Sequence, residues 1–141
     1  ADGTSSTILY GEHNISILGE TERIVEGPGW AGSWYGSTIF TSFYPINPQR
    51  KVQDEYGDGL SRSFVGAASS MHPGGANFAF ADGSVRWLKD TIDSWPVDAS
   101  TATPLGVTRD ANGLFQLKNT KFGVYQALTT RNGGEVISES Y

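Results

Sequence analysis

The stretch that decides the fold runs Asn77-Phe78-Ala79-Phe80-Ala81-Asp82-Gly83-Ser84-Val85-Arg86-Trp87-Leu88. It contains two runs in which large apolar residues alternate with small or polar ones, joined by the dipeptide Asp82-Gly83. Alternation with a period of two is typical of a half-buried strand, and Asp-Gly favours a two-residue type I′ turn. We therefore predict a β-hairpin centred on Asp82-Gly83.

A two-residue loop fixes the register of this hairpin, because turn length determines which residues pair. The predicted partners are Ala81 with Ser84, Phe80 with Val85, Ala79 with Arg86, and Phe78 with Trp87. One face would then carry four large apolar side chains, those of Phe78, Phe80, Val85 and Trp87. We expect this face to lie against the core, since burial of apolar surface is the main stabilising contribution.

Outside the hairpin, Gly, Pro, Asn, Asp and Ser recur throughout and divide the chain into short runs. Further strands are predicted at residues 7–10, 38–40 and 114–117, and a helix at residues 122–130. Residues 44–63 are expected to form an irregular surface connection, and residues 96–121 a loop or hairpin excursion. The predicted fold class is α+β, predominantly antiparallel β, with long loops and a short C-terminal helix.

Length and composition exclude several classes of protein. A chain of 141 residues predicts a single globular domain over residues 1–141. Ten Lys and Arg against fifteen Asp and Glu give a net charge of −5, which argues against nucleic-acid binding. The absence of cysteine excludes disulfides, thiolate zinc sites and cysteine nucleophiles.

The inventory of reactive side chains does not favour an enzyme. The chain has two histidines, and its serines do not form a Gly-x-Ser-x-Gly nucleophile elbow. We therefore predict no catalytic residues. The acidic stretch 54–59 makes Asp54 and Asp58 candidate calcium ligands, but Tyr56 occupies a position where an EF-hand loop has a ligand. A solvated acidic loop is the favoured interpretation, and no cofactor is predicted.

A glycine-rich segment at residues 27–37 carries three large aromatic residues, Trp30, Trp34 and Tyr35. Such rings can stack on sugars in a binding groove. They serve equally well in a core or in a protein interface. Packing onto the sheet or onto a neighbouring subunit is the favoured interpretation, with glycan contact as the alternative.

One spacing carries a family resemblance. Nine residues separate His72 from Asp82-Gly83, and three further segments match the same family in order: residues 2–12, residues 89–96 with 106–110, and residues 123–138. The chain resembles the prepilin-like bacterial surface proteins that carry a His, nine residues, Asp-Gly domain and are abundant in planctomycetes. Within this motif we expect structural roles for six residues: His72, Gly74, Gly75, Asn77, Asp82 and Gly83.

The resemblance implies a pilin-like or pseudopilin-like globular domain that is exported and assembled through an N-terminal hydrophobic helix. This sequence lacks that helix, so we expect a C-terminal portion of such a protein. The partners expected are copies of the chain itself, or a companion chain that supplies the N-terminal portion.

The resulting hypothesis is a non-enzymatic, extracellular structural subunit of a pilus-like or other surface filament. The expected subunit contacts, which are also the candidate glycan contacts, are Trp30, Trp34, Tyr35, Arg86, Arg131 and Glu135. The alternatives are a carbohydrate- or solute-binding module displayed at the cell surface, and a calcium-stabilised secretion pseudopilin.

Overall fold

The computed structural model describes residues 3–17, 39–52, 62–100 and 103–133. Its elements, in chain order, are the 3-10 helix η1 (Thr4–Ser6), strand β1 (Ile8–Gly11), the 3-10 helices η2 (Ile15–Ile17) and η4 (Pro48–Arg50), helix α2 (Arg62–Gly66), strands β2 (Gly75–Phe80), β3 (Val85–Lys89), β4 (Val107–Arg109) and β5 (Phe115–Leu117), and helix α3 (Val124–Leu128). All strand pairs are antiparallel, which confirms the predicted α+β class with its short C-terminal helix. No helix among the described residues has the length and apolar character needed to cross a membrane.

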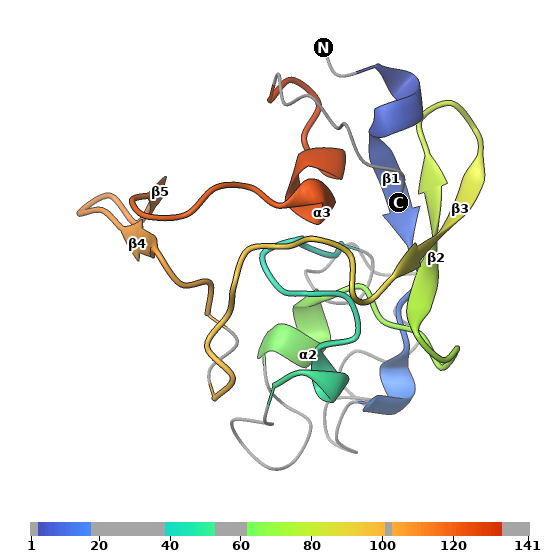
Figure 1. Cartoon of the computed structure of the whole chain (residues 1–141), viewed down its shortest axis with the longest axis horizontal. Coiled ribbons are helices and arrows are strands. Elements are labelled where there is room, and N and C mark those ends of the chain that lie inside the picture. The colour runs from blue at the N-terminus through green and yellow to red at the C-terminus, as the bar shows by residue number, and fades with distance from the viewer. Residues whose placement is uncertain (1–2, 18–38, 53–61, 101–102, 134–141) are drawn as a thin grey trace.

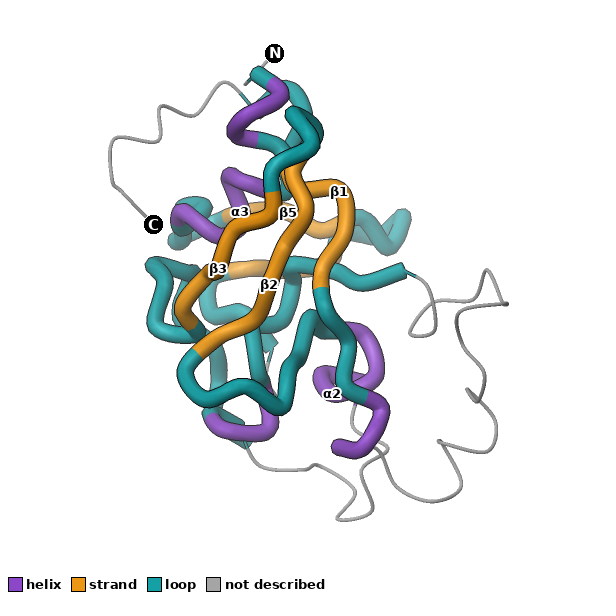
Figure 2. Tube along the Cα trace, turned by 90° about the vertical axis from the view of Figure 1, so that its right-hand side faces the viewer, coloured by secondary structure: helices purple, strands orange, loops and turns teal. Residues whose placement is uncertain are grey.

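The main sheet has the order β1-β2-β3, with β2 between its two neighbours (Figure 2). Strand β1 pairs with β2 through Ile8 opposite Phe80 and Tyr10 opposite Ala79, with an irregularity between these two pairs. Strand β1 was predicted at residues 7–10 and lies one residue further along. The predicted strand at 38–40 does not form at its two described residues, where Ile39 makes only a single bridge.

The hairpin of β2 and β3 exists, but its predicted register is wrong by one residue. Ala79 pairs with Val85, and Phe78 pairs with Arg86. The loop has three residues instead of two: the N–H of Gly83 donates to the carbonyl of Phe80 at 3.0 Å, and Gly83 has a φ of 83°. A type I′ turn needs positive φ at both central residues, whereas a three-residue loop ends in a single left-handed glycine.

This slip exchanges the two faces of β3, because successive side chains of a strand point to opposite sides. Val85 is 68% exposed and Trp87 is 38% exposed, so neither belongs to the core as predicted. Leu88 takes their place and is fully buried. The core joins one face of the sheet to α3 and to the chain before α2, and its buried members are Ile8, Ile46, Ala68, Ala76, Phe78, Phe80, Leu88, Tyr125 and Leu128.

Residues 45–48 are buried, although the sequence predicts an irregular surface connection over 44–63. At its centre Asn47 has no exposed surface and adopts a left-handed conformation with φ 53° and ψ 57°. Its side-chain oxygen accepts a hydrogen bond from the N–H of Ser70 at 2.7 Å, and its Nδ2 donates to the carbonyl of Gly75 at 3.1 Å. An asparagine tolerates this conformation better than most residues and joins two distant segments here.

A second, two-stranded sheet lies within the predicted excursion at 96–121. Strands β4 and β5 pair through Val107 with Leu117 and Arg109 with Phe115. Strand β5 agrees with the predicted strand at 114–117, and β4 was not predicted. The hairpin extends away from the main sheet, on the opposite side of α3 and α2 (Figure 1).

Candidate functional site

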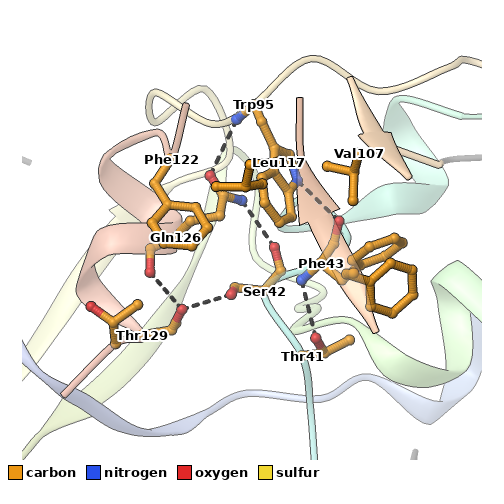
Figure 3. A pocket seen from close by; sticks show the side chains of 11 residues that line it. Thr41, Ser42, Phe43, Trp95, Val107, Leu117, Phe122, Gln126 and Thr129 are labelled. Carbon is orange, nitrogen blue, oxygen red and sulfur yellow. Dashed lines mark hydrogen bonds between the residues drawn. The ribbon is translucent and has the colours of Figure 1, made fainter. Parts of the chain in front are cut away.

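An aromatic cleft of about 350 Å³ lies between the β4–β5 hairpin, helix α3 and residues 41–43 (Figure 3). Four rings line it, those of Phe43, Trp95, Phe115 and Phe122. The remaining lining side chains are aliphatic, amide or hydroxyl groups: Val107, Leu117, Gln126, Thr41, Ser42, Thr129 and Thr130. None of these described lining residues carries a formal charge, so the cleft is apolar with a hydroxyl-bearing side.

The buried amide of Gln126 holds the walls of the cleft together. Its Oε1 accepts hydrogen bonds from the N–H of Trp95 and of Gly123, both at 3.2 Å. Its Nε2 donates to the carbonyl of Ser42 and to the hydroxyl of Ser94, both at 2.9 Å. These bonds use both donor hydrogens and both acceptor positions of the amide. The Gln126 side chain therefore supports the site and keeps no group for a ligand.

The start of α3 packs tightly against the segment that carries Trp95. A Cβ at Gly123 would collide with the backbone of Ser94 and Asp93, so only glycine fits there. The Asp93 carboxylate accepts a hydrogen bond from the N–H of Val124 at 3.1 Å, and the backbone carbonyl of Asp93 accepts one from the N–H of Tyr125 at 2.9 Å. These contacts satisfy backbone groups that a helix start leaves without partners.

The four rings contact one another in a chain. Phe43 lies 5.8 Å from Trp95 and 4.8 Å from Phe115, measured between ring centroids. Trp95 lies 5.7 Å from Phe122, and its indole N–H donates to the carbonyl of Phe43 at 3.1 Å. The guanidinium of Arg109 lies 5.1 Å from the centroid of Phe115. Phe115 therefore has neighbours in Phe43 and Arg109, while Phe122 is 38% exposed.

The hydroxyl groups of Ser42 and Thr129 are connected by hydrogen bonds. Thr129 Oγ1 donates to the carbonyl of Gln126 at 2.8 Å and lies 2.6 Å from Ser42 Oγ (Figure 3). Because a hydroxyl has one hydrogen and that of Thr129 is used, Ser42 donates to Thr129. The hydroxyl hydrogens of Ser42 and Thr129 are thus directed into the protein, and these two oxygens remain acceptors.

The β4–β5 hairpin, with its flanks, is termed the arm (residues 105–119). Its turn is organised by Asp110, whose Oδ1 accepts from the N–H of Asn112 and of Leu114, both at 2.9 Å. The hydrogen bond from Leu114 contributes most, and together the two bonds hold the pKa of the Asp110 carboxyl below its ordinary value. Four large apolar side chains of the arm are exposed by 45% or more: Leu105, Leu114, Phe115 and Leu117.

A second exposed apolar surface, termed the outer face, lies on the side of the main sheet that is turned away from the core. Its members are Tyr10, Ala79, Val85 and Trp87, which the strand register places on one side. Tyr10 is 73% exposed and Val85 is 68% exposed. No described element covers this face (Figure 2).

The motif aspartate and glycine form the turn of the β2–β3 hairpin. Asp82 Oδ1 accepts from the hydroxyl of Ser84 at 2.6 Å and from its N–H at 2.9 Å. Arg86 pairs with the other Asp82 oxygen at 3.0 Å and lies over the ring of Phe80 at 4.4 Å. The Ser84 hydrogen bonds, assisted by Arg86, lower the pKa of the Asp82 carboxyl. Arg86, predicted as a subunit contact, is half-buried and held in this turn.

The motif histidine lies at the entry to β2. The exposed ring of His72 meets the edge of Trp87 at 6.0 Å between centroids, and its backbone carbonyl accepts from Arg50 at 2.8 Å. A Cβ at Gly75 would collide with the carbonyl of Leu88 and with Trp87, so only glycine fits there. Gly74 has a φ of 84°, a conformation that glycine adopts at little cost.

The motif asparagine connects β2 to the end of β1. The carboxylate of Glu12 accepts from the side-chain amide of Asn77 at 3.0 Å and from its N–H at 2.9 Å. Burial raises the pKa of Glu12, but the Asn77 hydrogen bonds, with help from Ser70 and His72, leave it below its ordinary value. The six motif residues His72, Gly74, Gly75, Asn77, Asp82 and Gly83 thus each have a structural contact or conformation within or beside the hairpin.

The family model that matches the chain is SBP_bac_10, described as a protein of unknown function (DUF1559), and the match covers residues 1–94. The chain belongs to the DUF1559 family. The matched residues include all three strands of the main sheet and the motif from His72 to Gly83. No curated protein and no solved structure matches the chain.

The DUF1559 match ends one residue before Trp95, so the arm, helix α3 and most of the cleft lie beyond it. The later segments on which the resemblance also rested, 106–110 and 123–138, lie outside the match as well. Sequence reasoning did not identify the cleft, because its walls come from three separate segments. One local signal was present: Gln126 stands three residues after Gly123, the spacing at which a glutamine side chain accepts from the N–H of the N-cap residue.

The remaining predicted site residues fall into two groups. Arg131 is described and exposed, and it does not line the cleft. The others lie outside the described residues: Trp30, Trp34, Tyr35, Glu135, Asp54 and Asp58. Within the described part of the chain, no cluster of three or more His, Asp or Glu side chains is arranged to hold a metal ion.

Proposed function

We propose that this DUF1559 protein is a non-enzymatic structural subunit of an extracellular, pilus-like or other surface filament. The observation that carries the proposal is a pair of different exposed apolar surfaces, the arm and the outer face, on opposite sides of the described molecule (Figure 1). The prepilin-like sequence resemblance supports the same assignment.

The arm has the properties of a docking element. Leu114 is 61% exposed and Leu105 is 50% exposed, which is a high apolar exposure for so short a segment. An isolated two-stranded hairpin is marginally stable in water. Contact with another surface would cover these leucines and stabilise the arm.

The outer face offers a surface of matching character. Tyr10, Val85 and Trp87 form an apolar patch on a short, twisted sheet, and aromatic residues of this kind are enriched in protein interfaces. Because the arm and the outer face differ, contact between them on successive copies is heterologous. Heterologous contacts that do not close into a ring generate filaments.

The experiment starts with electron microscopy of the native material, in which we expect regular fibres. Two variants then test the contact, Leu114→Glu on the arm and Val85→Glu on the outer face. Each should fold, as judged by circular dichroism, and should remain monomeric alone. Ala99→Glu, which adds the same charge at an exposed residue outside both surfaces, should assemble like the wild type.

Mixing the two monomeric variants separates this contact from others. One intact arm and one intact outer face remain in the mixture, so a heterodimer should form and should not extend. Assembly of either variant alone to wild-type length would refute the proposed contact. A native protein that stays dispersed at all concentrations would refute the filament function.

A further inference from the structure

The aromatic cleft has the size of a small-ligand site. Its volume of about 350 Å³ lies at the lower end of the range of roughly 300–1,000 Å³ found for ligand pockets. Its walls are already in place, because the Gln126 amide and the indole N–H of Trp95 tie three segments together. A ligand would therefore find these three walls preformed.

The rings define the shape of the occupant. Phe115 is 55% exposed, but its ring already has Phe43 at 4.8 Å and Arg109 at 5.1 Å as neighbours. Trp95 is only 9% exposed. Phe122 is 38% exposed, and its ring neighbour among the described lining residues is Trp95, so we take Phe122 as the platform for a ligand. The ligand that fits has one flat apolar face.

The polar groups define its hydrogen-bonding character. Thr129 donates to a backbone carbonyl and Ser42 donates to Thr129, so both oxygens offer only acceptor lone pairs to a ligand. The Gln126 amide is fully used. A ligand that faces Ser42 and Thr129 must therefore bring hydroxyl or N–H donors of its own.

The uncharged lining of the cleft restricts the class of ligand further. The described residues that line the cleft include no Asp, Glu, Lys, Arg or His, and Arg109 lies against Phe115 without lining the cleft, so an ion entering it would lose hydration without a lining counter-charge. The occupant is therefore neutral, has hydroxyl donors and has an apolar face. A hexopyranose ring combines these properties.

We propose that the cleft binds one neutral hexopyranoside residue, stacked on Phe122 and donating hydroxyl hydrogens toward Ser42 and Thr129. This inference can be tested apart from assembly, because its key residues Phe122 and Ser42 belong to neither apolar surface. The sugar source is either a free glycoside or a unit of a polymer. Both present the same ring to the cleft.

The test is calorimetric titration of the whole protein with methyl β-glucopyranoside, methyl β-galactopyranoside and the matching β-linked disaccharides. We expect binding with a dissociation constant of about 1 mM or tighter for at least one of them. Tighter binding of a disaccharide than of its monosaccharide supports a polymer as the source, and equal binding supports a free glycoside. No binding by any of the four probes overturns the proposal.

Two ligand controls test the chemistry without changing the protein. Fully O-methylated methyl glucoside keeps the ring but has no donor hydrogens, so it should not bind. Glucuronate carries a charge and should bind at least tenfold more weakly than the neutral sugar. Equal affinity for the O-methylated compound would overturn the assignment of Ser42 and Thr129 as acceptors.

Protein variants test the platform. Phe122→Leu keeps an apolar side chain and should weaken binding about three- to tenfold, the amount expected from loss of an aromatic contact. Leu105→Ala, a matched loss of exposed apolar surface outside the cleft, should leave affinity unchanged. The monomeric Leu114→Glu variant should also bind normally, so failure of assembly and failure of sugar binding are distinguishable. Unchanged affinity in Phe122→Leu would overturn the platform assignment.

Discussion

Replacing Tyr125 with phenylalanine should stabilise the protein, although Tyr125 lies at the centre of the core. Its side chain has no exposed surface, its ring meets Phe78 edge-on at 6.0 Å, and its hydroxyl has no hydrogen-bond partner among the described residues. A buried polar group without a partner costs about 1–3 kcal/mol. Tyr125→Phe removes only that hydroxyl and keeps the ring. We expect the free energy of unfolding to rise by about 1–2 kcal/mol.

The dependence of stability on pH above 10 provides a second test of the buried Tyr125 hydroxyl. Burial raises the pKa of Tyr125 above its ordinary value of 10.0. Above that pH the unfolded chain loses the phenolic proton and the folded chain keeps it, so this contribution to stability falls as pH rises. The loss is roughly 1.4 kcal/mol per pH unit in the wild type and is absent in Tyr125→Phe.

The assay is urea unfolding followed by circular dichroism, at neutral pH and at pH values above 10, for the wild type and Tyr125→Phe. Tyr10→Phe is the matched control, because Tyr10 is 73% exposed and should change stability by less than about 0.5 kcal/mol. An unchanged urea dependence would show that only stability has altered. Destabilisation of Tyr125→Phe by 1 kcal/mol or more would mean that the hydroxyl has a partner, and would refute the reasoning.

Three further predictions concern the hairpin, the buried asparagine and the response to acid. Leu88→Ala should cost about 2–5 kcal/mol and Val85→Ala less than about 0.5 kcal/mol in urea unfolding, whereas the sequence-predicted register requires a large loss at Val85. Asn47→Ala should cost about 3 kcal/mol by the same measurement, and Asn47→Gly about 1 kcal/mol less because glycine tolerates the left-handed backbone; equal losses would contradict this account. Burial lowers the pKa of His13 from 6.5, and the Asn77 hydrogen bonds outweigh burial in lowering the pKa of Glu12 from 4.5. The unfolded chain therefore binds more protons, and stability should fall as pH drops below each of these values. His13→Gln should reduce the loss of stability between pH 6.5 and 5. The same loss in His13→Gln as in the wild type over this range would argue against the role of His13.

The sequence predicted the elements whose causes are local. Alternation around Asp82-Gly83 identified β2 and β3, and helical spacing from Phe122 onward identified α3. The register failed because Asp-Gly is compatible with both a two-residue and a three-residue loop. The choice between them depends on which residue of β3 the core accepts, and Leu88 fits under α3 where Val85 does not.

The burial of Asn47 and the aromatic cleft depend on contacts between distant parts of the chain. Asn47 looks like a loop residue in a proline-containing segment, and its burial follows from hydrogen bonds to Ser70 and Gly75. The cleft arises because Gln126 joins Ser42 to Trp95, three residues that are separated by at least 31 positions in the chain. No local pattern specifies such a meeting. The motif from His72 to Gly83 was visible in the sequence and proves to have structural contacts of its own.

Assembly and sugar binding, as proposed, share the arm, and thermodynamic linkage connects them. Phe115 and Leu117 line the cleft, while Leu105 and Leu114 are exposed on the same short hairpin. A ligand that packs against the inner side of the arm restricts a hairpin that is marginally stable alone, so assembly then loses less conformational freedom. Any factor by which saturating methyl glucoside lowers the critical assembly concentration must equal the factor by which assembly tightens sugar binding. Sedimentation with and without the glycoside measures the first factor and calorimetry on preformed fibres the second; we expect both above one, and a value of one for both would show that the arm transmits nothing between the two surfaces.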